Sequence, residues 1–270
     1  MPGKYIGILS VGPALAGLVM NVVRAITLLA FPGLDTKSKI YSSILFYAMA
    51  AFNLLLCLLA GFYEKGSPFF KHYNGLMNNK FAENRRNGVT KRAALGKLWE
   101  ALKSQWKPLF ALGLNFIVTF TVLPGVSNDL TLDFVSDPDW RDLFLITIGN
   151  LCDFGSRVCA QNFKFFRYSP NWQIFWSFLR IVFIVFMLLI ANKVGPDFLF
   201  GSDWFKILNL SAFFWINGMN TMNTSVSAAV GAPEHLKEEV GALIGTLLTG
   251  GILVGSLLQI PMKGLVPKRD

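Results

Sequence analysis

Residues 173–192 read QIFWSFLRIVFIVFMLLIAN, an apolar block that carries one charged side chain, Arg180. A helix of about 20 apolar residues crosses a hydrocarbon core of roughly 30 Å, so this block has the length of a membrane span. Its apolar residues are continuous, whereas the strands of a membrane barrel alternate between polar and apolar positions over about ten residues. The block therefore predicts a transmembrane helix.

Similar apolar blocks recur along the chain. The predicted spans cover residues 6–30, 40–63, 108–126, 142–163, 173–192, 205–230 and 240–262. Of the 270 residues, 53% are hydrophobic and 15% are charged, a composition more apolar than that of a soluble domain. We therefore expect an all-α, polytopic transmembrane helical bundle of about seven spans.

The expected organisation has three parts: two transmembrane helices in residues 1–63, a basic cytosolic loop in 64–107 and a five-helix bundle in 108–270. The loop has ten lysines and arginines against three glutamates, and the positive-inside rule assigns it to the cytosol. Because the loop holds much of the net charge of +9, no nucleic-acid partner is expected. Its residues 90–107 fit either an amphipathic helix on the membrane surface or a solvated linker.

Catalytic and metal-binding patterns are missing from the sequence. The three cysteines show no paired spacing, and His72 and His235 stand far apart in charged segments. No nucleophile with its base and no metal-ligand cluster can be assembled from these residues. We expect no enzyme activity, no catalytic residue, no metal and no cofactor.

Charged residues inside a span are the most informative feature, because a charge at the centre of a membrane helix costs about 2.5–3.5 kcal/mol. Asn150, Asp153 and Arg157 follow one another at spacings of three and four residues, which places them on one helix face. This polar stripe either lines a solute path, the interpretation we favour, or joins helices through an Asp153–Arg157 pair. Arg180 is either buried or extended toward the headgroups.

Two further patterns concern helix packing and polar contacts. The block 205–230 is rich in asparagine, threonine and serine, which predicts a helix that faces a cavity or another helix. Small residues at helical spacing predict close helix contacts in the first and last spans. They are Gly12, Gly17, Gly241, Gly245, Gly251 and Gly255.

Several motifs together resemble the equilibrative nucleoside transporter family, in the family's order. Residues 2–17 are similar to its fifth helix, and residues 120–126 to the end of its seventh. Residues 150–157, NLCDFGSR, resemble the eighth-helix pattern Asn-x-x-Asp-x-x-Gly-Arg, although the glycine comes one place early. Residues 217–255 are similar to its last two helices.

The resemblance implies a major-facilitator-like transporter that moves nucleosides or nucleobases down their gradient by alternating access. Asp153, Arg157, Asn150 and Leu123 would then contact the solute. The expected partners are this solute and the lipid bilayer, and the expected location is the plasma membrane or, alternatively, an organellar membrane.

The resemblance also implies that the chain begins at the family's fifth helix, so we expect a partial chain from a truncated gene model or clone. A membrane partner could then supply the missing helices. The alternative hypothesis is an accessory or structural subunit of a membrane complex, without transport activity of its own.

Overall fold

The computed structural model describes residues 3–32, 36–68, 70–72, 74–76, 78–79, 91–123 and 130–265. Its principal helices are α1 (Gly3–Ala30), α2 (Thr36–Lys65), α4 (Lys91–Ser104), α5 (Trp106–Val122), α7 (Pro138–Asn162), α8 (Pro170–Ala191), α9 (Asp197–Phe200), α10 (Asp203–Gly231) and α11 (Lys237–Lys263). Two 3₁₀ turns, η1 (Lys164–Phe166) and η2 (Glu234–Leu236), join helices. The residues in these ranges include no strand, and the all-α prediction is confirmed.

Each predicted span lies on a helix, apart from its last residue or two in some cases and residues 124–126, which lie outside the described residues. Among the described residues, five helical segments are long and apolar enough to cross a membrane: Val11–Ala30, Thr36–Lys65, Pro138–Asn162, Pro170–Ala191 and Glu234–Met262. Helix α5 is a shorter apolar helix. Helix α10 has 29 residues but is rich in asparagine and threonine, which lowers its hydropathy. The chain is a multi-pass helical membrane protein.

The chain forms two compact units, Val22–Lys97 and the remainder, Met1–Asn21 with Leu98–Asp270. In the smaller unit, the Arg24 guanidinium donates to Ser42 Oγ at 3.1 Å and lies over the Phe46 ring. This arginine therefore joins α1 to α2. None of the apolar window of α2 is buried, as expected for a helix whose surface faces lipid or other helices.

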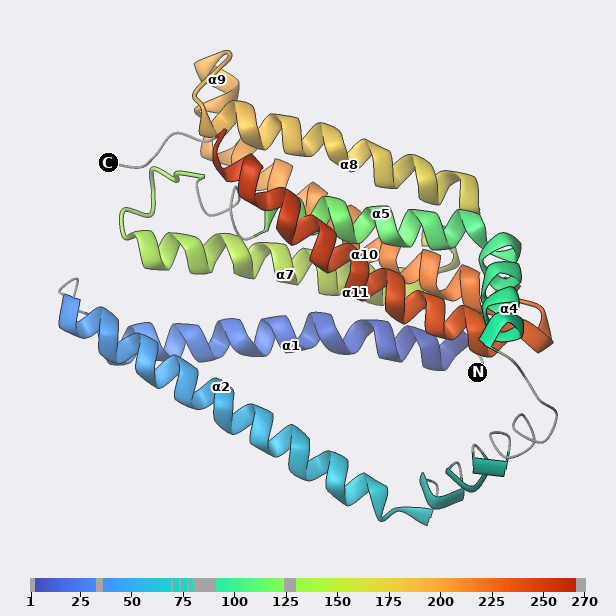
Figure 1. Ribbon diagram of the computed structural model, residues 1–270. Coiled ribbons are helices and arrows are strands. Elements are labelled where there is room, and N and C mark those ends of the chain that lie inside the picture. Colours follow the sequence, from blue (N-terminus) through green and yellow to red (C-terminus); the bar gives the residue numbers. More distant parts are fainter. Residues whose placement is uncertain are drawn as a thin grey trace. The chain divides into compact units, whose positions relative to one another are not determined.

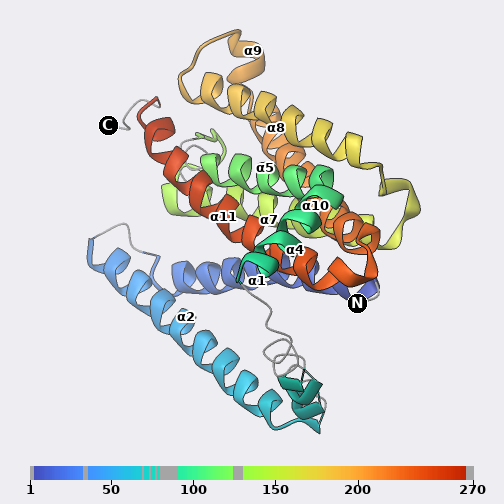
Figure 2. The same ribbon diagram turned by 45° about the vertical axis from the view of Figure 1, so that its right-hand side comes forward.

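The larger unit is built around α10. This helix packs against α7, α8, α5 and α11, and α5 packs against α8 and α11 (Figures 1 and 2). Apolar side chains from α5, α7, α8 and α10, including Val122, Leu145, Met187 and Phe213, form the principal core. Because α10 packs against four helices, most of its residues 209–225 are buried.

Local sequence signals fix the start of α7. The Asp137 carboxylate accepts hydrogen bonds from the backbone N–H groups of Asp139 and Trp140, and Pro138 occupies the first turn. An aspartate N-cap followed by proline is a strong start signal for a helix. The acidic segment before α7 therefore supplies the cap that fixes where the helix carrying Asp153 begins.

Glycines allow α11 to approach α5 closely. A Cβ atom on Gly255 would lie 2.6 Å from the carbonyl oxygen of Ile117, and one on Gly251 would lie 2.8 Å from Phe116 Cβ. Gly12, Gly241 and Gly245 differ, because a Cβ there would meet nothing within 4 Å. A packing role for those three glycines stays a prediction.

We predict that Gly255→Ala destabilises the protein by about 1–3 kcal/mol, because the added methyl forces α11 away from α5. Gly241→Ala is the matched control, since alanine there meets open space and favours the helix by up to about 1 kcal/mol. Thermal unfolding in detergent should give a lower midpoint for Gly255→Ala and an equal or higher one for Gly241→Ala. Equal midpoints for the two variants would contradict the packing account.

Candidate functional site

All four residues predicted to contact a solute line one cavity of about 540 Å³ in the larger unit. Asn150, Asp153 and Arg157 come from α7, and Leu123 follows the last turn of α5. Helices α10 and α11 and the first half of α1 complete the wall. The volume lies in the usual range for small-molecule sites.

Asp153 and Arg157 form an ion pair one helical turn apart. Arg157 Nε donates to Asp153 Oδ2 at 2.9 Å, and a second guanidinium nitrogen donates to Oδ1 at 3.3 Å. Both side chains are nearly buried, with residue exposures of 7% and 6%. Two groups on one helix face thus present a carboxylate and a guanidinium to the same cavity.

The carboxylate of Asp153 is also held from α10. Asn217 Nδ2 donates to Asp153 Oδ1 at 2.6 Å. The next residue, Gly218, lies so close to α7 that a Cβ there would collide with the Asp153 carbonyl oxygen and Ser156 Oγ. Because residue 218 is glycine, α10 can approach α7 closely enough for the Asn217 side-chain amide to reach the Asp153 carboxylate.

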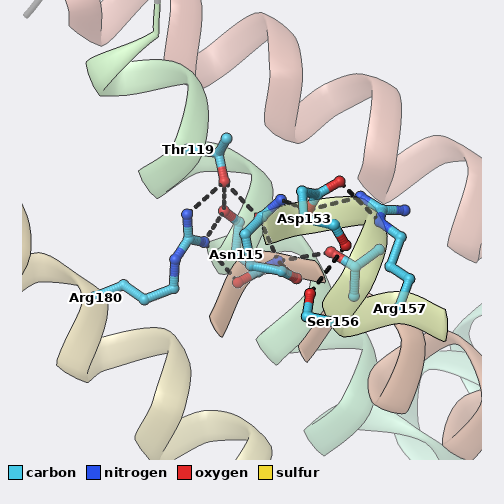
Figure 3. Close-up of polar contacts among 8 residues, drawn as sticks. Asn115, Thr119, Asp153, Ser156, Arg157 and Arg180 are labelled. Carbon is cyan, nitrogen blue, oxygen red and sulfur yellow. Dashed lines mark hydrogen bonds and ion pairs between the residues drawn. The ribbon is translucent and has the colours of Figure 1, made fainter. Parts of the chain in front are cut away.

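A chain of hydrogen bonds continues from Asn217 to a second arginine; Figure 3 labels its members Asn115, Asp153 and Arg180. Asn115 Nδ2 donates to Asn217 Oδ1 at 2.9 Å, and Arg180 donates to Asn115 Oδ1 at 2.6 Å. Because each amide nitrogen faces an acceptor and each amide oxygen faces a donor, both side-chain orientations are fixed. We call this path, from Arg180 through Asn115 and Asn217 to Asp153, the amide relay.

Arg180 itself is completely buried, so the alternative in which it reaches the headgroups is wrong. Its guanidinium donates to the carbonyl oxygens of Asn115 and Phe213 and to Thr119 Oγ. It also lies 4.1 Å from the centre of the Phe213 ring, a cation–π geometry that favours a desolvated cation. Arg180 thus joins α8 to α5 and α10.

Polar residues of α10 divide between two faces. Asn217, Thr221 and Ser225 line the cavity. Asn220 instead accepts from the Tyr168 hydroxyl and donates to Ser177 Oγ on α8. The two interpretations that the sequence allowed for this helix, cavity lining and helix contact, therefore each hold for one face.

Sequence reasoning missed Asn115 and Thr119. They lie within an apolar stretch, and their spacing of four residues was the available signal that they share a face. Their partners on α8 and α10 lie 61 to 106 residues away in sequence. Within the ranges that the structure describes, no cluster of three histidine, cysteine, aspartate or glutamate side chains could hold a metal ion.

Comparison with known proteins gives a consistent result. A family model described as nucleoside transporter matches residues 1–263. The chain belongs to the nucleoside transporter family. It is 22% identical over 265 residues to the "Equilibrative nucleotide transporter 1" of Arabidopsis thaliana, an alignment that covers 96% of this chain and 56% of that relative. This member of the family therefore spans little more than half the length of that relative.

The amide relay predicts a large cost for Asn115→Leu, a change that nearly preserves volume. It would leave Arg180, Asn217 and Thr221 each without one buried partner, and one such loss costs about 1–3 kcal/mol. Asn162→Leu is the matched control, because Asn162 is exposed and its amide donates to the Val158 carbonyl on its own helix; surface changes of this kind stay within about 0.5 kcal/mol. Unfolding midpoints that fall equally for both variants would rule out the relay.

Proposed function

We propose that the chain carries the solute-binding half of a transporter that moves nucleosides or nucleobases across a membrane by facilitated diffusion. The observation that supports this most directly is the convergence of Asp153, Arg157, Asn150 and Leu123 on one cavity inside the helical bundle. Membership of the family indicates transport of nucleosides or nucleotides in general. The cavity chemistry supports the finer assignment.

The polar side of the cavity suits the groups that a nucleoside offers. A carboxylate has about four acceptor positions, and Asp153 uses three of them on Asn217 and Arg157. The remaining capacity fits a sugar hydroxyl or a ring N–H as donor. Asn150 adds an amide that can both donate and accept; a Cβ atom added to Gly17 would lie only 3.1 Å from its Nδ2 atom.

Aromatic side chains line the cavity as well. Phe116 and Phe120 from α5 have stacked rings with centres 6.4 Å apart, and both line the cavity with Phe214 from α10. An aromatic face favours a flat heterocycle, since base stacking on such rings is worth about 1–3 kcal/mol. A solute with an apolar face and a hydroxyl-rich edge matches both the aromatic and the polar residues of the lining.

Nucleotides are the second candidate. Lys237 lines the same cavity as Arg157, so two cations face the space where a phosphate would lie, and the Arabidopsis relative is named for nucleotides. Lys237 is paired with Glu234, which reduces its availability, and Asp153 repels an anion. We therefore favour the uncharged solutes.

For transport we propose alternating access, in which the bundle opens the cavity to one side of the membrane at a time. The cavity wall includes residues from helix ends: Leu123 follows the last turn of α5, and Lys237 begins α11. Relative movement of such helices would open one end while closing the other.

We predict that Asp153→Asn weakens uridine binding roughly 10- to 100-fold. The neutral amide replaces the carboxylate, so the charge-assisted hydrogen bond to the solute, worth about 1.5–3 kcal/mol, is lost. The measurement is the ligand-induced rise in unfolding midpoint of the purified protein, followed by uptake into liposomes. Asp197→Asn, on α9 and outside the cavity, is the control and should bind as the unmodified protein does. Competition with uridine 5′-monophosphate separates the two solute classes.

Unchanged uridine binding by Asp153→Asn would remove this carboxylate from the mechanism. Binding of the monophosphate at least as tight as that of uridine would favour the nucleotide assignment instead.

A further inference from the structure

One exposed tryptophan lies on the second half of α4 and another at the start of α5, and α4 is buried at the residue Ala101 between them. Trp99 is 58% exposed and Trp106, at the start of α5, is 52% exposed, whereas Ala101 between them is completely buried. A lysine accompanies each ring: Lys103 Nζ lies 5.3 Å from the Trp99 ring centre, and Lys107 Nζ lies 5.7 Å from that of Trp106. Tryptophan beside lysine is the combination typical of membrane interfaces, where the indole lies at headgroup level and the ammonium reaches the phosphates.

These side chains lie where two spans begin. The apolar stretch of α5 follows directly after Lys107, whose ammonium donates to Asn171 Oδ1 at the start of α8 at 2.8 Å. The starts of α5 and α8 therefore lie at the same end of the bundle (Figure 1). Trp172 on α8 is also 54% exposed, which adds a third indole at this level.

The buried side of α4 contacts the turn between α10 and α11. Ala101 belongs to one apolar cluster with Leu236 and Val240. Gln105 Nε2 donates to the Gly231 carbonyl at 2.7 Å, and His235 lies 3.5 Å from the Glu100 carboxylate. Residues just after this turn, Lys237 and Gly241, line the solute cavity.

We propose that Trp99, Lys103, Trp106 and Lys107 form a binding surface for anionic phospholipid headgroups, and that this surface anchors the turn between α10 and α11 to the membrane. Charge complementarity selects lipid as the partner. Residues 64–107, which end in this surface, include ten basic and three acidic residues, and the leaflet on the side that the positive-inside rule assigns to them is anionic. An aromatic surface flanked by lysines binds such a leaflet by burying indoles and pairing ammonium groups with phosphates.

The test uses the full chain labelled with 5-fluorotryptophan in nanodiscs. Fluorine resonances of Trp99 and Trp106 are assigned with Trp99→Phe and Trp106→Phe, exposed positions at which phenylalanine leaves the buried side of α4 unchanged. Headgroup spin-labelled lipid should broaden both resonances, and more strongly when about one third of the phosphatidylcholine is replaced by phosphatidylglycerol. A water-soluble paramagnetic complex should broaden them less in these nanodiscs than in detergent.

Lys103→Gln with Lys107→Gln should reduce the phosphatidylglycerol-dependent part of the broadening at least twofold. The control is Lys193→Gln, an exposed lysine in the turn between α8 and α9. Broadening by the soluble complex alone, no effect of phosphatidylglycerol, or equal behaviour of the double variant and the control would each overturn the proposal. So would protection of both indoles by a co-purified protein instead of by lipid. None of these outcomes depends on solute transport.

Discussion

The carboxylate of Asp153 lies inside a helical bundle, and the packing around it is organised to hold that charge. A buried ion loses several kcal/mol of hydration and persists only with well-placed partners. Here the partners come from the same helix through Arg157 and from α10 through Asn217. The amide relay extends the set to Arg180, whose own charge is held by carbonyl and hydroxyl oxygens of α5 and α10. One anion and two cations thus tie four helices together.

This arrangement separates the polar residues that hold helices together from the polar residues that can contact a solute. Arg180 and Asn115 are completely buried among helices, whereas Asp153, Arg157 and Asn217 border the cavity. A solute that displaces or adds one hydrogen bond at Asp153 would meet a carboxylate already oriented from behind, which lowers the reorganisation needed on binding. The same division along α10 explains why a helix so rich in asparagine is stable in a membrane protein: its asparagine amides have partners outside α10, on α5, α7 or α8 and, for Asn223, at the Phe166 carbonyl in η1.

Much of this was predictable from the sequence, and the rest was not for physical reasons. Continuous apolar blocks predicted the helices, and the spacing of Asn150, Asp153 and Arg157 predicted a polar stripe on one face. The relay was not predictable, because Asn115 and Arg180 are single polar residues whose meeting depends on how α5 and α8 pack. Glycine spacing likewise could not tell which pair contacts a helix: 241/245 and 251/255 have the same pattern, yet only the second meets α5. The sequence of residues 90–107 did not decide between a helix and a linker. The packing of Ala101 on the bundle explains why α4 forms there.

The most direct test of the central claim is a double-mutant cycle between Asp153→Asn and Arg180→Gln, with the free energy of unfolding as the readout. In the part of the chain that the structure describes, no hydrogen bond joins Asp153 directly to Arg180. Energetic coupling between them must therefore pass through Asn115 and Asn217 or through the electric field of the two charges. The account predicts a coupling energy of about 0.5–3 kcal/mol, reduced when Asn217→Ala interrupts the relay. Effects that add within about 0.5 kcal/mol, or a coupling that Asn217→Ala leaves unchanged, would contradict it.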